Sequence, residues 1–105
     1  PPSSDMHSHE KKLLVVIAEA ALEKALVRDA RQFGAHGYTI YDVRGGGESG
    51  ERAAQWDADR LIEMKVVCEA TVAERLARHV LESYAPYYAV TMFTADVGVF
   101  RPQKF

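Results

Sequence analysis

The stretch LLVVIA at residues 13–18 is an unbroken apolar run, which predicts a buried strand over Lys12–Ala18. The pattern then changes to a helical period through Ala20–Phe33, where apolar side chains recur every three or four positions. These apolar positions are Leu22, Leu26, Ala30 and Phe33. Gly34 follows at the place where a helix end favours a left-handed residue. A buried strand that leads into an amphipathic helix therefore begins the fold.

The rest of the chain repeats this order of strand and helix. Three more strands are expected, at His36–Val43, Arg60–Glu69 and Tyr87–Val97. Thr71 and Glu74 form a capping box that predicts a second helix, which runs to about Tyr84 before Pro86. The similar segments VVIAEA at 15–20 and VVCEA at 66–70 indicate a faint internal repeat of about 50 residues. This order predicts an α+β, ferredoxin-like βαββαβ fold, with a four-stranded antiparallel sheet and two helices on one face.

Composition limits the class of protein. The chain has 105 residues with 13 basic and 15 acidic side chains, a net charge of −2. This fits one domain, and we expect residues 1–10 to be a disordered tail before a folded domain at 11–105, in which Gly98–Phe105 is a short extension. The near-neutral charge argues against nucleic-acid binding, and the longest apolar run is too short to span a membrane. One cysteine, Cys68, cannot form an internal disulfide, which favours a reducing, cytoplasmic setting.

Assembly is expected because a chain this short has little room for a deep site of its own. Four apolar residues are expected on the sheet face away from the helices, where another subunit would cover them: Tyr38, Ile40, Met64 and Val66. Three tyrosines near the end of the second helix are expected at a subunit contact, with stacking on a base as the alternative: Tyr84, Tyr87 and Tyr88.

Gly45–Asp59 is rich in glycine and charge and is predicted to be one long mobile loop. Its entry, RGGGESG at Arg44–Gly50, would let backbone N–H groups approach an anion without obstruction by a Cβ atom. Arg44 and Arg52 would add forked donors to a phosphate or carboxylate. The motif is neither a Walker A sequence nor a Rossmann fingerprint, and a merely flexible loop is the alternative. Trp56 is expected to contact a partner or ligand, unless it folds back onto its own sheet.

Enzyme and metal motifs are absent from the sequence, which has no nucleophile elbow, no HExxH and no CxxC. Cys68 ends an apolar strand and is expected to be a small core residue. His7 and His9 on a tail would make a poor metal site, while His36 and His79 have no partner in the sequence. His79 is expected to face solvent. We therefore predict no catalytic residues and no metal site.

Three segments together resemble the PII signalling superfamily: KLLVVI at 12–17, GAHGYTI at 34–40 and RGGG at 44–47. The resemblance covers about Lys11–Arg101 and is greatest to the PII-like proteins of inorganic-carbon metabolism, of the carboxysome-associated and bicarbonate-transporter-associated types. It implies a ferredoxin-like homotrimer that binds adenine nucleotides between subunits, has no prosthetic group and is not an enzyme. A long loop, the T-loop, would respond to ligand and contact a partner, often a membrane transporter.

The resemblance also implies roles for single residues. Gly45–Asp59 matches the T-loop, with Trp56 in its partner-binding part, and Thr39 matches the strand residue that touches the adenosine. Gly45 and Gly47 match the glycines beside the phosphates, and Arg101 falls near an arginine that reaches the phosphates from the neighbouring subunit. The predicted nucleotide site is therefore Gly37, Thr39, Arg44, Gly45, Gly46, Gly47 and Arg101.

The chain departs from the family pattern in three ways. Its T-loop has no tyrosine, Glu48 takes the place of a loop arginine, and Tyr84–Tyr88 replaces the glycine-rich, lysine-containing segment that holds ATP phosphates. These changes favour ADP or AMP over ATP with Mg²⁺. The resemblance implies bicarbonate as a second ligand where loop N–H groups and an arginine converge, with Ser49, Arg52 and Arg60 as its candidate residues.

The expected function is regulation of inorganic-carbon uptake or of a bicarbonate transporter. Two alternatives stay open at this point. One is a small metal-binding or catalytic trimer on the same fold, because a fold does not dictate a function. The other is an RNA-binding module, although the aromatic strand motif and the basic surroundings that such domains need are absent.

Overall fold

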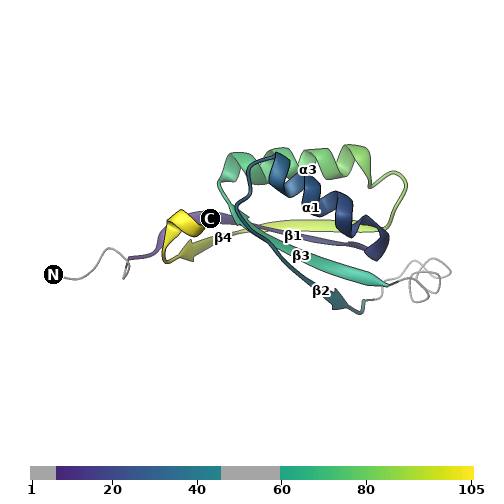
Figure 1. The fold of residues 1–105 in the computed structure, drawn as a ribbon, viewed down its shortest axis with the longest axis horizontal. Coiled ribbons are helices and arrows are strands. Elements are labelled where there is room, and N and C mark those ends of the chain that lie inside the picture. Colours follow the sequence, from purple (N-terminus) through teal and green to yellow (C-terminus); the bar gives the residue numbers. More distant parts are fainter. Residues whose placement is uncertain (1–6, 46–59) are drawn as a thin grey trace.

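The computed structural model describes residues 7–45 and 60–105. Within them, four strands form one sheet: β1 His9–Glu19, β2 Thr39–Val43, β3 Leu61–Cys68 and β4 Val90–Val99. The helical elements are η2 Ala20–Leu22, α1 Glu23–Gln32, α3 Ala70–Ser83 and η3 Pro102–Lys104, of which η2 and η3 are short 3-10 turns. Figure 1 shows α1 and α3 side by side over one face of the sheet. None of the helices described is long and apolar enough to cross a membrane.

The sheet has the strand order β2-β3-β1-β4, and each pair of neighbours is antiparallel. The connection through α1 joins β1 to β2 across β3, and the connection through α3 joins β3 to β4 across β1. Each half is thus a βαβ unit split by a strand of the other half, which is the ferredoxin-like arrangement. The predicted fold class is confirmed.

The core lies between the sheet and its two helices. Side chains of β1 and β3 that point to the helices are almost completely buried, since both strands are central in the sheet. They are Leu14, Val16, Ala18, Ile62, Met64, Val66 and Cys68. The helices contribute Leu26 and Ala30 from α1 and Ala73, Leu76 and Val80 from α3. Each leucine, isoleucine, valine or methionine side chain among them contributes about 1.5–3 kcal/mol when it is fully buried.

The prediction of which residues lie on the uncovered sheet face is wrong for three of the four residues named, all except Tyr38, which is 41% exposed. Met64 and Val66 are buried under the helices and Ile40 packs against the same core, so they do not lie on the uncovered face. Successive side chains of a strand point to opposite faces, and a continuous apolar run does not say which set points to the helices. The uncovered face instead carries the other set, which is apolar along the centre of β1 but includes Glu63 and Lys65 of β3. The register places Leu13, Val15, Ile17, Val67, Phe93 and Val97 there.

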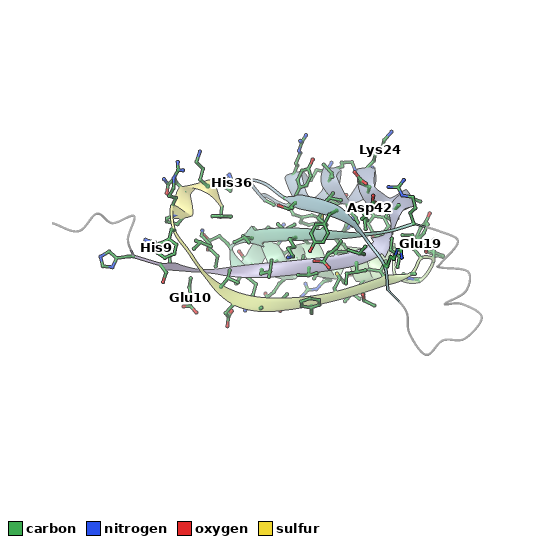
Figure 2. The ribbon with its side chains drawn as sticks, turned by 90° about the horizontal axis from the view of Figure 1, so that it is seen from below. His9, Glu10, Glu19, Lys24, His36 and Asp42 are labelled. Atoms are coloured by element: carbon green, nitrogen blue, oxygen red, sulfur yellow. The ribbon has the colours of Figure 1, made fainter. Side chains whose placement is uncertain are left out.

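The expected tail at residues 1–10 is wrong at its last two residues. His9 and Glu10 belong to β1, where they pair with Val99 and Gly98 of β4. Both strands continue past the helices as a ribbon, so polar side chains there face solvent and give no apolar signal. Figure 2 shows His9 and Glu10 at this end of the sheet. The extension expected from Gly98 onward likewise begins inside β4 and continues into η3.

The helix ends confirm one expectation and correct another. Gly34 has φ +101°, and Ala35 N–H donates to the Ala30 carbonyl at 2.9 Å, while Gly34 N–H donates to the Arg31 carbonyl at 3.1 Å. This is a Schellman motif with glycine at its left-handed position. The capping box does not form, since α3 begins at Ala70 with Glu69 as N-cap and no side-chain cap bond. The helix starts directly where β3 ends, before the threonine could cap it.

Candidate functional site

The predicted site lies partly at the base of the loop between β2 and β3. Arg44 and Gly45 directly follow Val43, the last residue of β2. Val43 pairs with Leu61, the first residue of β3, and Arg60 directly precedes Leu61. Arg60 donates an N–H to Asp42 Oδ1 at 2.9 Å, and this bond raises the pKa of the Arg60 guanidinium. Both side chains are exposed, so their ion pair adds little stability. The pair leaves further guanidinium donors at the loop base for a ligand.

Two glycines of the predicted site are not required by the fold. A Cβ atom added to Gly37 would meet nothing within 4 Å, and one added to Gly45 would meet only Leu61 Cδ1 at 3.9 Å, an ordinary contact. Neither has a φ in the left-handed region, unlike Gly34. Packing and backbone geometry therefore accept a side chain at both positions, and closeness to a ligand remains as a reason for glycine.

Thr39 is the first residue of β2 and is exposed. It lies opposite Lys65, whose amine is 5.4 Å from the centre of the Tyr41 ring. Tyr41 in turn donates its hydroxyl to Glu63. Thr39 therefore stands at the edge of the uncovered sheet face, beside a polar cluster that is already paired.

Arg101 lies at the opposite end of the sheet. From His9 to Glu19, β1 advances ten residues, roughly 33 Å at the rise of an extended strand. Val99 pairs with His9 at one end of β1, and Leu61 pairs with Glu19 at the other end, beside the loop base. Arg101 follows Val99 and Arg60 precedes Leu61, so these two arginines lie at opposite ends of β1. A single chain thus brings Arg44, Gly45 and Arg60 together but not Arg101. The backbone of Arg101 is left-handed, with φ 59°, which is rare for a residue other than glycine.

The remaining predicted residues lie outside the part of the chain that the structure describes. They are Gly46, Gly47, Ser49, Arg52 and Trp56. The nucleotide and bicarbonate roles of these residues, and the T-loop over most of Gly45–Asp59, stay predictions.

The turn from α3 to β4 is fixed at both of its ends. At its start, the Tyr84 hydroxyl donates to Asp29 of α1. At its end, Ala89 N–H donates to Glu19 Oε2 at 2.6 Å. Between these anchors, Tyr87 is 80% exposed. The subunit contact expected of Tyr84, Tyr87 and Tyr88 stays a prediction. Figure 1 shows this turn at the same end of the sheet as the loop base.

Sequence reasoning missed a polar cluster between the two helices. Asp29 is 2% exposed and accepts hydrogen bonds from Tyr84, from His79 Nε2 at 3.1 Å and from Arg28, whose N–H groups lie at 3.3 and 3.4 Å. The Ser83 hydroxyl lies 3.4 Å from the other ring nitrogen of His79. His79 is therefore partly buried rather than solvated. The sequence feature that could have indicated this cluster is Asp29, which lies within the apolar stripe of the first helix. A carboxylate buried at such a position needs hydrogen-bond donors from other side chains.

Cys68 confirms the prediction of a small core residue. Cys68 is buried, and this burial raises the pKa of its thiol, which suits a core residue better than a nucleophile. Among residues 7–45 and 60–105, no three histidine, cysteine, aspartate or glutamate side chains gather as a metal site would require.

The fold and the exposed loop base define a small α+β domain with donors at one end of its sheet. The family model of nitrogen regulatory protein P-II matches residues 11–104. The chain therefore belongs to the PII family of signalling proteins, as the sequence resemblance indicated. No match was found among curated proteins.

Solved structures agree with this assignment. A candidate PII-like signalling protein from Thermus thermophilus is 36% identical, with a TM-score of 0.80, and the match covers 95% of this chain and 99% of that one. CPII from Thiomonas intermedia K12, bound to ADP, AMP and acetate, is 22% identical with a TM-score of 0.81 over 95% and 98% of the chains. CPII bound to ADP and bicarbonate is 24% identical with a TM-score of 0.79 over 93% and 96%.

Proposed function

We propose that this protein is a non-enzymatic PII-like sensor that binds ADP or AMP between the subunits of a homotrimer. Bicarbonate would bind with the nucleotide, and through the loop 45–59 the protein would regulate inorganic-carbon uptake or a bicarbonate transporter. We expect it to act in the cytoplasm, where adenine nucleotides and the inner face of such a transporter meet.

The exposed loop base is the observation that carries this proposal. Arg44 and Arg60 are exposed there, and the fold does not require glycine at Gly45. Thr39 and Gly37 lie toward the other end of β2, where Thr39 pairs with Lys65. A nucleotide phosphate needs close backbone approach and forked cationic donors, and this surface has both. The related CPII fold, solved with ADP, AMP and bicarbonate, supports these ligands for the present chain.

A neighbouring subunit is needed if Arg101 contributes to this site. The sheet separates Arg101 from the loop base by roughly 33 Å, far beyond the reach of one side chain. A second copy would have to place its own Arg101 against the loop base of the first. This requirement supports a nucleotide site between subunits rather than within one.

The uncovered sheet face supports the trimer. It carries Leu13, Ile17 and Val97, and Phe93 is 56% exposed in the centre of β4. A patch of this kind on a small domain marks an interaction surface. We assign the face to the contacts between the three subunits.

Bicarbonate would bind among Ser49, Arg52 and Arg60 beside the nucleotide. A small monoanion offers few contacts and binds weakly alone, so both ligands would order the same loop. Each would then raise the affinity of the other by the same factor, a coupling of about 1–3 kcal/mol. The ordered loop, including Trp56, would present a changed surface to the partner.

Calorimetry on the assembled protein tests the nucleotide site. We expect binding of ADP and AMP, weaker binding of ATP, and tighter nucleotide binding when bicarbonate is present. Gly45→Ala should weaken ADP binding by about tenfold or more through a clash with the ligand, while its thermal unfolding stays that of the wild type. Arg101→Ala should lower the affinity by a similar factor, and Lys104→Ala serves as the control for charge at the same end of the chain.

The proposal fails if neither nucleotide binds, or if bicarbonate leaves the affinity unchanged across all nucleotides. A normal affinity in Arg101→Ala would remove that residue from the site and leave the rest of the proposal standing on Gly45→Ala.

A further inference from the structure

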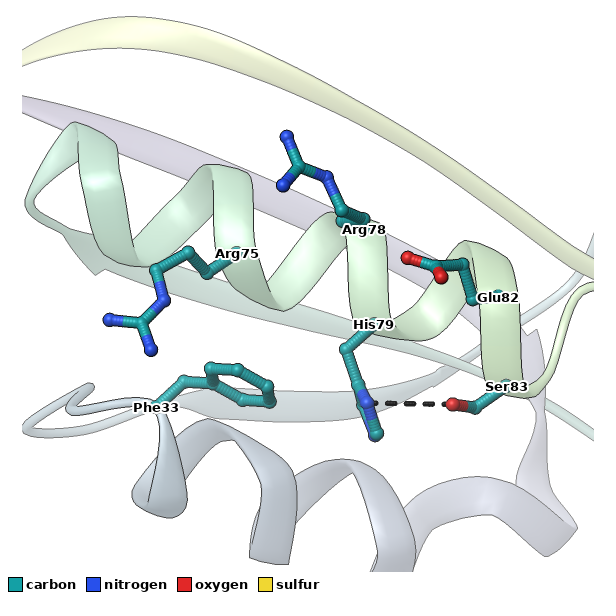
Figure 3. A pocket seen from close by; sticks show the side chains of 6 residues that line it. All are labelled: Phe33, Arg75, Arg78, His79, Glu82 and Ser83. Carbon is teal, nitrogen blue, oxygen red and sulfur yellow. Dashed lines mark hydrogen bonds between the residues drawn. The ribbon is translucent and has the colours of Figure 1, made fainter.

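The seam between the two helices contains a pocket that the proposed function does not use. It has a volume of about 300 Å³ and is lined by Phe33 at the end of α1 and by residues of α3, namely Arg75, Arg78, His79, Glu82 and Ser83. Arg75, His79 and Ser83 are four positions apart, so they share one face of the helix, and Arg78 and Glu82 lie beside this row. Figure 3 shows Phe33 and His79 on one side of α3 with Arg75 directed toward Phe33, while Arg78 is directed away from the two rings, on the side of Glu82.

The base of the pocket is held in place by the buried Asp29. His79 Nε2 donates to Asp29, and the Phe33 ring packs against the His79 ring with 5.2 Å between their centres. Ser83 faces the other nitrogen of His79, as the dashed line in Figure 3 shows. Because these rings are fixed by contacts from both helices, a ligand would not have to order them.

The charge of the pocket is positive although the chain as a whole is negative. In the part of the chain that the structure describes, no carboxylate lies within 4.0 Å of the Arg75 or Arg78 guanidinium. Arg75 instead lies 5.8 Å from the centre of the Phe33 ring. Glu82 is the one acid that lines the pocket, and Asp29 below it already pairs with Arg28 and His79.

We propose that this pocket binds a small, planar organic carboxylate. A guanidinium fork matches the two oxygens of a carboxylate, and the Phe33 and His79 rings, whose planes are tilted by 49° to each other, offer aromatic contacts to the body of such a molecule. Glu82 disfavours a second negative charge, so a monoanion fits better than a phosphate. The volume is at the lower limit of ligand pockets and suits a ligand of one ring.

Benzoate titrated into the wild-type protein is the test, with the backbone amide and aromatic resonances followed by NMR. Benzoate should shift the resonances of Phe33, His79 and Ser83, whereas benzamide, its uncharged analogue, and inorganic phosphate should not. Arg75→Gln should weaken benzoate binding by about tenfold, as expected for the loss of a charged hydrogen bond, and Arg78→Gln should weaken it by a smaller factor, because Arg78 is directed away from the two rings. Lys24→Gln removes the same charge from an exposed site on α1 and should change binding less than about twofold.

Equal binding of benzoate and benzamide would overturn the proposed role of the arginines. Shifts confined to other parts of the protein, or equal benzoate affinity in all three variants, would overturn the pocket itself. ADP titration of the same variants separates this inference from the proposed function, since Arg75→Gln and Arg78→Gln should bind ADP as the wild type does.

Discussion

The two faces of the sheet differ in how completely a single chain closes them. On the helical face, Leu14, Met64 and Leu76 have no exposed surface, and the one buried charge among the described residues, Asp29, has donors from three residues. On the other face, Phe93 is 56% exposed although it lies beside the central strand β1. One face is thus complete within the chain, and the other is the face that we assign to the contacts of the proposed trimer.

Phe93→Glu is the change with the largest expected effect, because it puts a charge onto the uncovered face, beside the central strand β1. We expect loss of the trimer, and with it loss of nucleotide binding, while the helical content of the monomer is retained. Sedimentation equilibrium measures the mass, and circular dichroism measures the helix content. Leu81→Glu is the matched control, since Leu81 is 57% exposed but lies on α3, and it should stay trimeric. Equal masses for the two variants would assign the contact to another surface.

Leu26→Ala tests the closed face. Leu26 is fully buried between α1 and the sheet, so its truncation should lower the free energy of unfolding by about 2–5 kcal/mol. Urea unfolding at one fixed protein concentration measures this, because assembly makes stability depend on concentration. Leu81→Ala on the exposed surface of α3 should change stability by less than about 0.5 kcal/mol. A small loss for Leu26→Ala would mean that the core tolerates the cavity by collapsing around it.

Tyr84→Phe tests the polar cluster of the closed face and its dependence on pH. Removing one donor from buried Asp29 should cost about 1–3 kcal/mol at pH 8, measured by urea unfolding. Burial and the hydrogen bond to Asp29 raise the pKa of Tyr84 above its ordinary value of 10. The neutral Tyr84 phenol therefore makes its full contribution to the free energy of unfolding below pH 10. This contribution is lost as the pH rises through the folded-state pKa of Tyr84.

Tyr84→Phe has no phenol to titrate, so it should not lose this contribution at alkaline pH. The difference in the free energy of unfolding between wild type and Tyr84→Phe should therefore shrink above pH 10. A difference that stays constant to pH 11 would show that Tyr84 does not titrate with the unfolding reaction.

Gly34→Ala should have the smallest effect on the closed face. Alanine at φ +101° is strained, so we expect a loss of about 1–2 kcal/mol, measured by thermal and urea unfolding. Gly37→Ala, in open space with an ordinary φ, should leave stability unchanged or slightly raised. If both variants lose the same stability, the left-handed turn is not what requires Gly34.

The sequence predicted the class and order of the fold because these depend on local patterns. The apolar run at residues 13–18 and the helical period after it correspond to β1 and α1, and the Gly34 turn ends that helix as expected. The base of the candidate site was also predictable, since Arg44 and Gly45 follow a strand directly. The separation of Arg101 from that base was not, because it depends on the direction and register of β4 against β1.

Other features depend on contacts between segments far apart in the sequence. Asp29, His79 and Tyr84 come from two helices that the sheet brings together, so no window of the sequence contains their cluster. The start of α3 follows from the end of β3 rather than from its capping motif.

By itself, the sequence determined that this chain forms two strand-helix-strand halves in one ferredoxin-like domain, since hydrophobic period and turn residues act locally. Only the tertiary structure decided which side of each strand faces the helices. That choice follows from the packing of Leu14, Met64 and Val66 under α1 and α3, because a shift of one residue in register moves every side chain to the opposite face. The same choice left Phe93 on the surface where the chain meets its neighbours in the proposed trimer.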